Sequence, residues 1–136
     1  MIWTANRILS LILGIVFTII GIVGFFFSST MRVANMGGFD VDVVHNIVHL
    51  VTGIIALIAT FMPWSRLFNQ IFGVVYTLLG LAGLVYPAFY FDHRLLGIMH
   101  VNAVDHVLHL VAGIIALAVG FFVTGTEIRR TPTPTS

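Results

Sequence analysis

Histidine and aspartate side chains that could bind a metal ion occur in two short blocks of the sequence. His45 and His49 are four residues apart in the first block, and His106 and His109 are three apart in the second. Side chains at these spacings share one face of a helix. Imidazole nitrogens bind Zn²⁺, Cu²⁺, Ni²⁺ and iron, whereas Ca²⁺ and Mg²⁺ prefer oxygen ligands. The candidate metal ligands are therefore His45, His49, Asp105, His106 and His109.

The pair His49 and His109 also suits a planar cofactor. On facing helices, the two imidazoles could be the axial ligands of a haem, or one of them could bind another tetrapyrrole of the chlorophyll type. Asp105 would then be a ligand or a group that orients one. The cofactor hypothesis thus has two forms, a transition-metal ion or a tetrapyrrole, and both predict a stoichiometric bound ligand.

A purely structural role for the same residues is an alternative. Asp42 and Asn102 stand where helix N-caps are expected, with His45 and Asp105 at the third helical position. Asp105 there resembles the acidic half of a capping box. The histidines would then hydrogen-bond to one another, to Asn46 and to loop carbonyls, and would hold the outer loops on the bundle.

Transport and catalysis have less support. Passage of protons or solutes would use Asp105 and the histidines, but no charged residue lies deeper in the helices than His49 and His109. The sequence has no cysteine, no nucleophile elbow and no H-E-x-x-H motif. Hydrolysis by a histidine-bound metal would need Asp105 as its general base. We therefore expect a protein that is not an enzyme.

The composition indicates that lipid surrounds the elements that carry these residues. Hydrophobic residues make up 59% of the 136 residues and charged residues only 8%. About a quarter of the residues in a soluble domain are charged, and a small domain cannot hide this much apolar surface from water. The net charge near +1 also leaves no basic surface for nucleic acid. The partner that the composition predicts is the lipid bilayer.

Four stretches are long and apolar enough to cross a bilayer as helices. They cover approximately residues 8–27, 43–62, 67–86 and 103–124. No alternating pattern of strands is present, so a membrane barrel is not expected. The predicted fold is an all-α, integral membrane four-helix bundle, in which His49 and His109 lie at the same depth and close to one membrane surface.

The arginines predict the orientation. Arg7, Arg66, Arg129 and Arg130 fall on one side of the membrane, and Arg32 and Arg94 on the other. The positive-inside rule then places both termini in the cytoplasm of a multi-pass protein of the inner (cytoplasmic) membrane. The histidines would lie on the extracytoplasmic side.

The two halves of the sequence resemble each other at an offset of about sixty residues. Residues 14–24 match 73–83, and residues 49–57 match 109–117. Each copy contains two spans, so both copies cross the membrane in the same direction. This predicts two tandem helical hairpins related by a pseudo-two-fold axis along the membrane normal.

Small residues recur at helical spacing in both copies. Gly14, Thr18 and Gly21 share one face, as do Gly73, Thr77 and Gly80. Such faces let helix backbones approach closely in lipid, and Gly53 and Gly113 are candidates for the opposing surfaces.

We expect a single four-span membrane domain over residues 1–128. The first repeat covers about 7–64 and the second about 65–124, and the Thr- and Pro-rich tail 129–136 is expected to be disordered in the cytoplasm.

The tandem blocks H-N-x-x-H-L at residues 45–50 and D-H-x-x-H-L at residues 105–110 carry a family resemblance. Together with the glycine-rich first and third spans, they resemble the bacterial membrane family called domain of unknown function 4383, over about residues 7–124. The resemblance implies a small four-helix bacterial membrane protein and no established chemistry. The role expected first is that of an accessory or scaffolding subunit, which associates with itself or with a larger membrane assembly. The alternative is a protein that binds a metal or tetrapyrrole.

Overall fold

The computed structural model describes residues 1–85, 89–91 and 94–124. Its helices are α1 (Ala5–Phe27), α2 (Val43–Phe61), α3 (Ser65–Val85) and α4 (Ala103–Leu117), which continues into the π-helical segment η2 (Ala118–Phe122). Within the described residues these give four segments long and apolar enough to cross a membrane, which confirms the predicted four-helix membrane architecture. Some predicted features lie outside the described residues. They are the end of the third span at residue 86, the arginines Arg129 and Arg130, and the tail 129–136.

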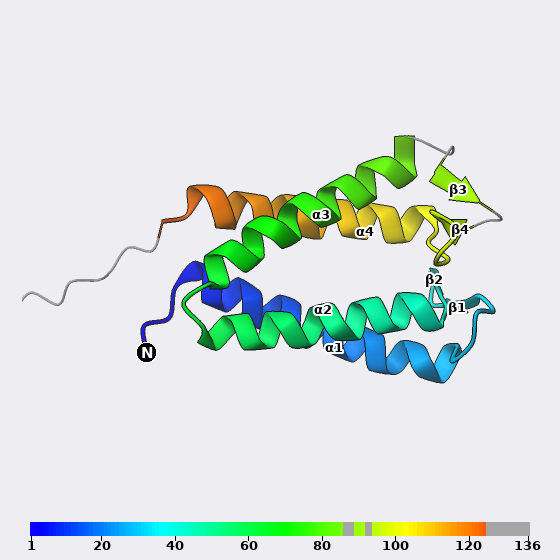
Figure 1. Cartoon of the computed structure of the whole chain (residues 1–136), viewed down its shortest axis with the longest axis horizontal. Coiled ribbons are helices and arrows are strands. Elements are labelled where there is room, and N and C mark those ends of the chain that lie inside the picture. Colours follow the sequence, from blue (N-terminus) through cyan, green and yellow to red (C-terminus); the bar gives the residue numbers. More distant parts are fainter. Residues whose placement is uncertain (86–88, 92–93, 125–136) are drawn as a thin grey trace, which may run out of the picture.

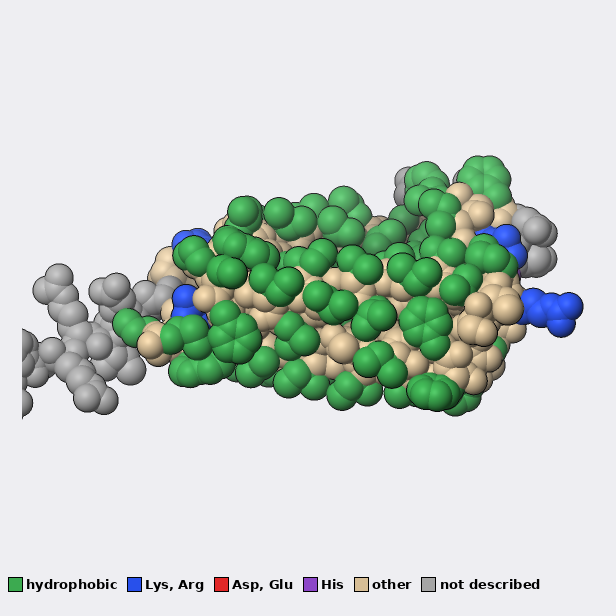
Figure 2. Space-filling model, turned by 60° about the horizontal axis from the view of Figure 1, so that its bottom comes forward, with side chains coloured by type: hydrophobic (Ala, Val, Ile, Leu, Met, Phe, Trp, Pro, Cys, Tyr) green, Lys and Arg blue, Asp and Glu red, His purple; other side chains and the backbone are tan. Residues whose placement is uncertain are grey.

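The helices form two antiparallel hairpins that lie side by side, α1 with α2 and α3 with α4 (Figure 1). The N-terminus and the short connection between α2 and α3 lie at one end of the bundle, which we call the N-terminal end. The four short strands lie at the other end, which we call the strand end. Hydrophobic side chains cover the length of the bundle on the face shown in Figure 2, and arginine side chains lie near both ends. This surface is that of a protein in contact with membrane lipid.

Small residues bring the two helices of each hairpin close together. A Cβ atom added to Gly21 would lie 2.7 Å from the backbone nitrogen of Leu50, and one added to Gly80 would lie 2.7 Å from that of Leu110. The glycines on the opposing helices also pack closely, since Gly53 lies against Thr18 and Gly113 lies against Thr77. The predicted small-residue faces therefore pack inside each hairpin.

Residues that correspond in the two repeats also meet each other between the hairpins. These pairs are Ser10 with Asn69 (hydrogen bond, 3.2 Å), Phe17 with Tyr76 (ring centroids 5.2 Å apart) and His49 with His109 (5.8 Å). A two-fold axis between the hairpins would bring corresponding residues together in this way. The axis itself stays a prediction, which these contacts support.

At the N-terminal end, three buried polar side chains join the hairpins: Asn6, Ser10 and Asn69, which we call the amide clasp. The Asn69 amide nitrogen donates to the backbone and side-chain oxygens of Asn6, both at 2.9 Å. Ser10 donates to the Asn69 side-chain oxygen, and the Asn6 amide donates to the Val123 carbonyl at 3.3 Å. Each polar side chain of the clasp is thus hydrogen-bonded, as buried polar groups require.

The end of η2 is held by side chains of α3. The Gly120 carbonyl accepts hydrogen bonds from Arg66 Nε at 2.9 Å and from Gln70 Nε2 at 3.0 Å, and the Phe121 carbonyl accepts from Arg66 Nη2. The last carbonyls of a helix have no partner within the helix and carry partial negative charge. The cation Arg66 therefore satisfies them and fixes the second hairpin.

Four short strands at the strand end add to the predicted all-α fold. There, β1 (Ala34–Met36) pairs with β2 (Phe39–Val41), and β3 (Tyr90–Phe91) pairs with β4 (Arg94–Leu95), all antiparallel. Strands this short cannot display an alternating pattern. The signal in the sequence is the pair Gly37 and Gly38, whose positive φ angles of 62° and 105° form the turn between β1 and β2.

Candidate metal site

Three histidines from two helices converge between the hairpins. His45 and His49 come from α2 and His109 from α4, and all three are buried. One ring nitrogen of each lies within 4.8 Å of the corresponding nitrogens of the other two. The ring centroids of His45 and His49 are 4.4 Å apart, and that of His109 lies 5.9 Å and 5.8 Å from them. We call these three residues the histidine cluster.

Helix capping sets the depth of the cluster. The Asp42 side chain accepts a hydrogen bond from the backbone nitrogen of His45 at 2.9 Å, and the Asn102 side chain caps α4 in the same way. Asn102 and Asp105 form the predicted capping box. His49 and His109 each follow their cap by seven residues, about two helical turns, so the two rings reach the same level.

The backbone of β2 orients the ring of His45. The Nδ1 atom lies 2.8 Å from the carbonyl oxygen of Asp40. Because a carbonyl only accepts, Nδ1 carries a proton, and Nε2 is the atom that offers a lone pair in the neutral ring. This Nε2 is buried without a hydrogen-bond partner. A histidine that donates one ring nitrogen to a carbonyl and keeps the other as an acceptor has the arrangement typical of a metal ligand.

The other two histidines are enclosed by aromatic rings. The Phe17 ring lies edge-on to His49 with centroids 5.0 Å apart, and the Tyr76 ring lies edge-on to His109 at 5.2 Å. Both ring nitrogens of His49 and the Nδ1 of His109 are buried without a hydrogen-bond partner. A buried polar atom without a partner costs about 1–3 kcal/mol. The expected structural network, in which the histidines bond to one another, therefore does not account for these atoms.

Asp105 lies beside the histidine cluster and lines the same pocket. Its Oδ2 accepts hydrogen bonds from the backbone nitrogen of Asn102 at 2.8 Å and from that of Asp40 at 3.1 Å. The group of three ligand atoms within 4.8 Å does not include this carboxylate. Asp105 thus fixes the β1–β2 hairpin on α4 and places a negative charge close to the imidazoles.

His106 is turned toward its own hairpin. Its Nε2 contacts the Tyr90 hydroxyl, and its ring packs where a Cβ of Gly83 would stand. Asn46 packs in the same way against Gly24 in the first hairpin. His106 therefore corresponds to the structural Asn46 and lies outside the histidine cluster, although its ring centroid is 6.4 Å from that of His109.

The strand end contributes contacts that the sequence analysis did not identify. The Asp42 carboxylate, which caps α2, also accepts from the backbone nitrogen of His100 at 2.8 Å, and Asn102 donates to the Gly38 carbonyl at 2.8 Å. Asp40 bonds to both His45 and Asp105 through its backbone, with its carbonyl oxygen to His45 and its nitrogen to Asp105. Backbone groups have no signature in the sequence, so only the turn glycines beside Asp40 hinted at this role.

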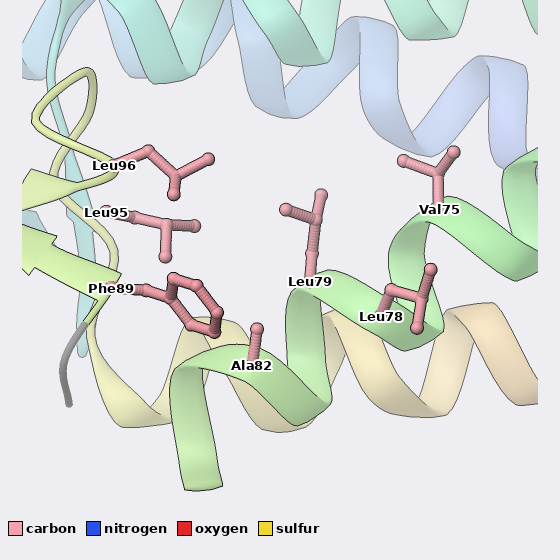
Figure 3. Close-up of a pocket in the computed structure, with 7 residues that line it drawn as sticks. All are labelled: Val75, Leu78, Leu79, Ala82, Phe89, Leu95 and Leu96. Atoms are coloured by element: carbon pink, nitrogen blue, oxygen red, sulfur yellow. The ribbon is translucent and has the colours of Figure 1, made fainter. Parts of the chain in front are cut away.

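A pocket of about 310 Å³ opens beside the histidine cluster. It is lined by the three histidines, Asp105 and apolar residues of α1, α4 and the β1–β2 hairpin. A second hollow, of about 330 Å³, is lined by α3 residues such as Leu79 and Ala82 and by Phe89, Leu95 and Leu96 (Figure 3). All its lining side chains are apolar, so it offers no metal ligand. Of these two hollows, the first alone combines space with donor atoms.

Comparison with known proteins gives a family and no function. The family model described as Domain of unknown function (DUF4383) matches residues 7–122, nearly the whole chain. No curated protein and no solved structure matches the chain. The resemblance predicted from the tandem histidine blocks and the glycine-rich first and third spans is thus confirmed: the chain belongs to the DUF4383 family.

Proposed function

We propose that this protein binds a first-row transition-metal ion, such as Zn²⁺, inside the membrane bundle. The ligands are His45, His49 and His109. The observation that carries the proposal is the set of buried ring nitrogens without hydrogen-bond partners, on three imidazoles from two helices that converge on one point. Unpartnered buried polar atoms in a folded protein call for a physical reason, and a bound ion supplies one.

The spacing of the nitrogens supports an ion of this size. Metal–nitrogen bonds of 2.0–2.1 Å in a tetrahedral site put ligand nitrogens about 3.3 Å apart. The three nitrogens lie within 4.8 Å of one another, so the rings move inward by about 1 Å when the ion binds. No hydrogen bond at the ring nitrogens of His49 opposes this movement.

The charges around the site also favour a cation. The three imidazoles are neutral donors, and the Asp105 carboxylate in the same pocket offsets part of the charge of a divalent ion. Asp105 is already engaged as a helix cap and as an acceptor from Asp40, so we assign it an electrostatic role and no role as a general base. The function proposed is binding, without catalysis.

A metal ion is favoured over a tetrapyrrole. A haem bound between His49 and His109 would need its broad, flat ring to extend sideways from the axis that joins them. His45, Phe17 and Tyr76 stand around this axis, each with a ring centroid within 6 Å of one of the two histidines. These three rings leave no room for a macrocycle on their sides of the histidine pair, and the open space beside the cluster is the pocket of about 310 Å³.

The orientation in the membrane stays a prediction from the sequence. Arg7 and Arg66 lie at the N-terminal end, and Arg32 and Arg94 lie at the strand end. Each end thus has two arginines, so the prediction of cytoplasmic termini depends on Arg129 and Arg130. With this orientation in the inner membrane, the histidine cluster is on the extracytoplasmic side.

The accessory or scaffolding role also stays a prediction. Glycine faces on membrane helices can also bind another chain, which would suit such a role. These faces pack within each hairpin, so self-association would have to use other surfaces. The metal site needs no partner and is the function that we test first.

The test is metal content and metal affinity of the full chain purified in detergent. We expect about one Zn²⁺ or Co²⁺ per chain, and for Co²⁺ the intense visible absorption of a four-coordinate ion. His49→Ala should abolish both. The matched control is His106→Asn, which removes a neighbouring histidine and installs the residue that the first hairpin carries at the corresponding place, Asn46.

Two results would contradict the proposal. One is wild-type protein that takes up no metal at micromolar free Zn²⁺ or Co²⁺. The other is a control variant that loses metal as completely as His49→Ala does, because binding would then not depend on the histidine cluster.

A further inference from the structure

We infer that the ion in the histidine cluster keeps one coordination position for an exchangeable small molecule, and that this molecule is a neutral nitrogen donor with an apolar body. The inference rests on the proposed metal site. Three protein ligands leave one position of a tetrahedral ion open, which is the pattern of metal sites that bind water or substrate. The three histidines line the pocket, so a molecule bound at this open position would lie in the pocket.

The walls of the pocket are apolar and come from separate parts of the fold. Ile20 of α1 and Leu108 of α4 form part of them, and Met36, Phe39 and Val41 of the β1–β2 hairpin form the rest. Among the lining residues, the polar side chains are those of the histidine cluster and Asp105. An apolar pocket with a few convergent polar groups is the usual form of a small-molecule site.

The size of the pocket sets the size of the ligand. A cavity of about 150 Å³ lined by apolar side chains holds one benzene molecule. The pocket here measures about 310 Å³, which is space for about two such rings, a donor heterocycle and one further small ring.

The charge of the pocket sets the chemistry of the donor group. The Asp105 carboxylate already places one negative charge beside the divalent ion, which lowers the gain from a second anionic group such as a carboxylate or phosphate. A neutral nitrogen heterocycle binds a transition-metal ion and adds no charge to the membrane interior. It would replace a water molecule on the ion, with no proton to place elsewhere.

The wall that covers the pocket is held in place before a ligand arrives. The backbone nitrogen of Asp40 donates to Asp105, and Asn102 donates to the Gly38 carbonyl, so both the turn and strand β2 are bonded to the start of α4. A wall fixed in this way loses little conformational freedom when a ligand binds.

The test uses Co²⁺-loaded full-length protein in detergent and two probes, imidazole and 4-phenylimidazole. We expect both probes to shift the visible Co²⁺ spectrum, and 4-phenylimidazole to bind at least about tenfold more tightly, because burial of the phenyl ring adds that much affinity.

A matched pair of variants locates the binding. Ile20→Phe fills the pocket and should weaken 4-phenylimidazole at least tenfold while Co²⁺ still binds. Ile19→Phe adds the same ring to the neighbouring residue, which is exposed to lipid and does not line the pocket, and it should bind like wild type. Both variants are measured in the same detergent, so partition of the probe into micelles affects both affinities equally and does not change their ratio.

The outcomes separate the two proposals. A Co²⁺ spectrum that neither probe changes, or equal probe affinities in the two variants, overturns the pocket inference and leaves the metal site standing. Absence of the Co²⁺ spectrum in wild-type protein overturns the metal site, and the pocket inference with it.

Discussion

The two hairpins meet through buried polar side chains in two regions, the amide clasp near the N-terminal end and the histidine cluster near the strand end. In the clasp, Asn6, Ser10 and Asn69 satisfy one another and reach one further carbonyl. In the cluster, the rings are just as buried, but most of their nitrogens have no hydrogen-bond partner. A complete network holds a fold together, whereas an incomplete one in a membrane interior is a place for something else to bind.

The largest effect on stability is expected in the clasp. Asn69→Leu leaves the side-chain oxygen of Asn6 and the Ser10 hydroxyl buried without their partner, and each such group costs about 1–3 kcal/mol. We expect the free energy of unfolding in mixed micelles to fall by about 3 kcal/mol. Zn²⁺ affinity of the folded fraction should stay unchanged; a loss of affinity would show that the two regions are not independent.

The cluster should respond in the opposite way. His49→Leu removes a buried ring that has no hydrogen bond, so the metal-free protein should unfold at the same free energy or a slightly higher one. Zn²⁺ affinity should fall more than about 100-fold, since even residues that only orient ligands contribute 10–100-fold. The measurements are unfolding in the presence of a chelator and competition with a chromogenic chelator. Loss of stability without loss of metal would instead favour the structural role.

Asp105→Asn separates charge from capping. Asn can still accept the hydrogen bonds from Asn102 and Asp40, but it removes the negative charge beside the ion. We expect Zn²⁺ affinity to fall about tenfold, in the range for groups around the ligands. An affinity within twofold of wild type would mean that Asp105 serves the capping box only. Circular dichroism checks that the helices are intact.

The smallest effect is expected for Ser10→Ala. It removes one neutral hydrogen bond, the one to the Asn69 side-chain oxygen, and should cost about 1 kcal/mol in the same unfolding assay. A cost of zero would show that this hydrogen bond does not stabilise the clasp, and the contrast between the clasp and the cluster would then be smaller.

The sequence predicted the helices, their caps and the meeting of His49 with His109 because these follow from apolar length, capping residues and the repeat. It could not separate His106 from the cluster. The i, i+3 spacing to His109 is real, but the contacts with Gly83 and the Tyr90 hydroxyl depend on the packing of α3 and on a loop. The amide clasp was missed for a similar reason, since Asn6 and Asn69 lie near the starts of their helices and belong to no recognisable motif.

The most direct test of the central claim is the X-ray absorption spectrum of Zn²⁺ bound to the full-length protein in detergent. Three imidazoles predict a shell of nitrogen neighbours at about 2.0–2.1 Å together with the outer-shell scattering of histidine rings. Both should disappear in His49→Leu. A shell of oxygen atoms without imidazole scattering, the same in wild type and variant, would contradict the account.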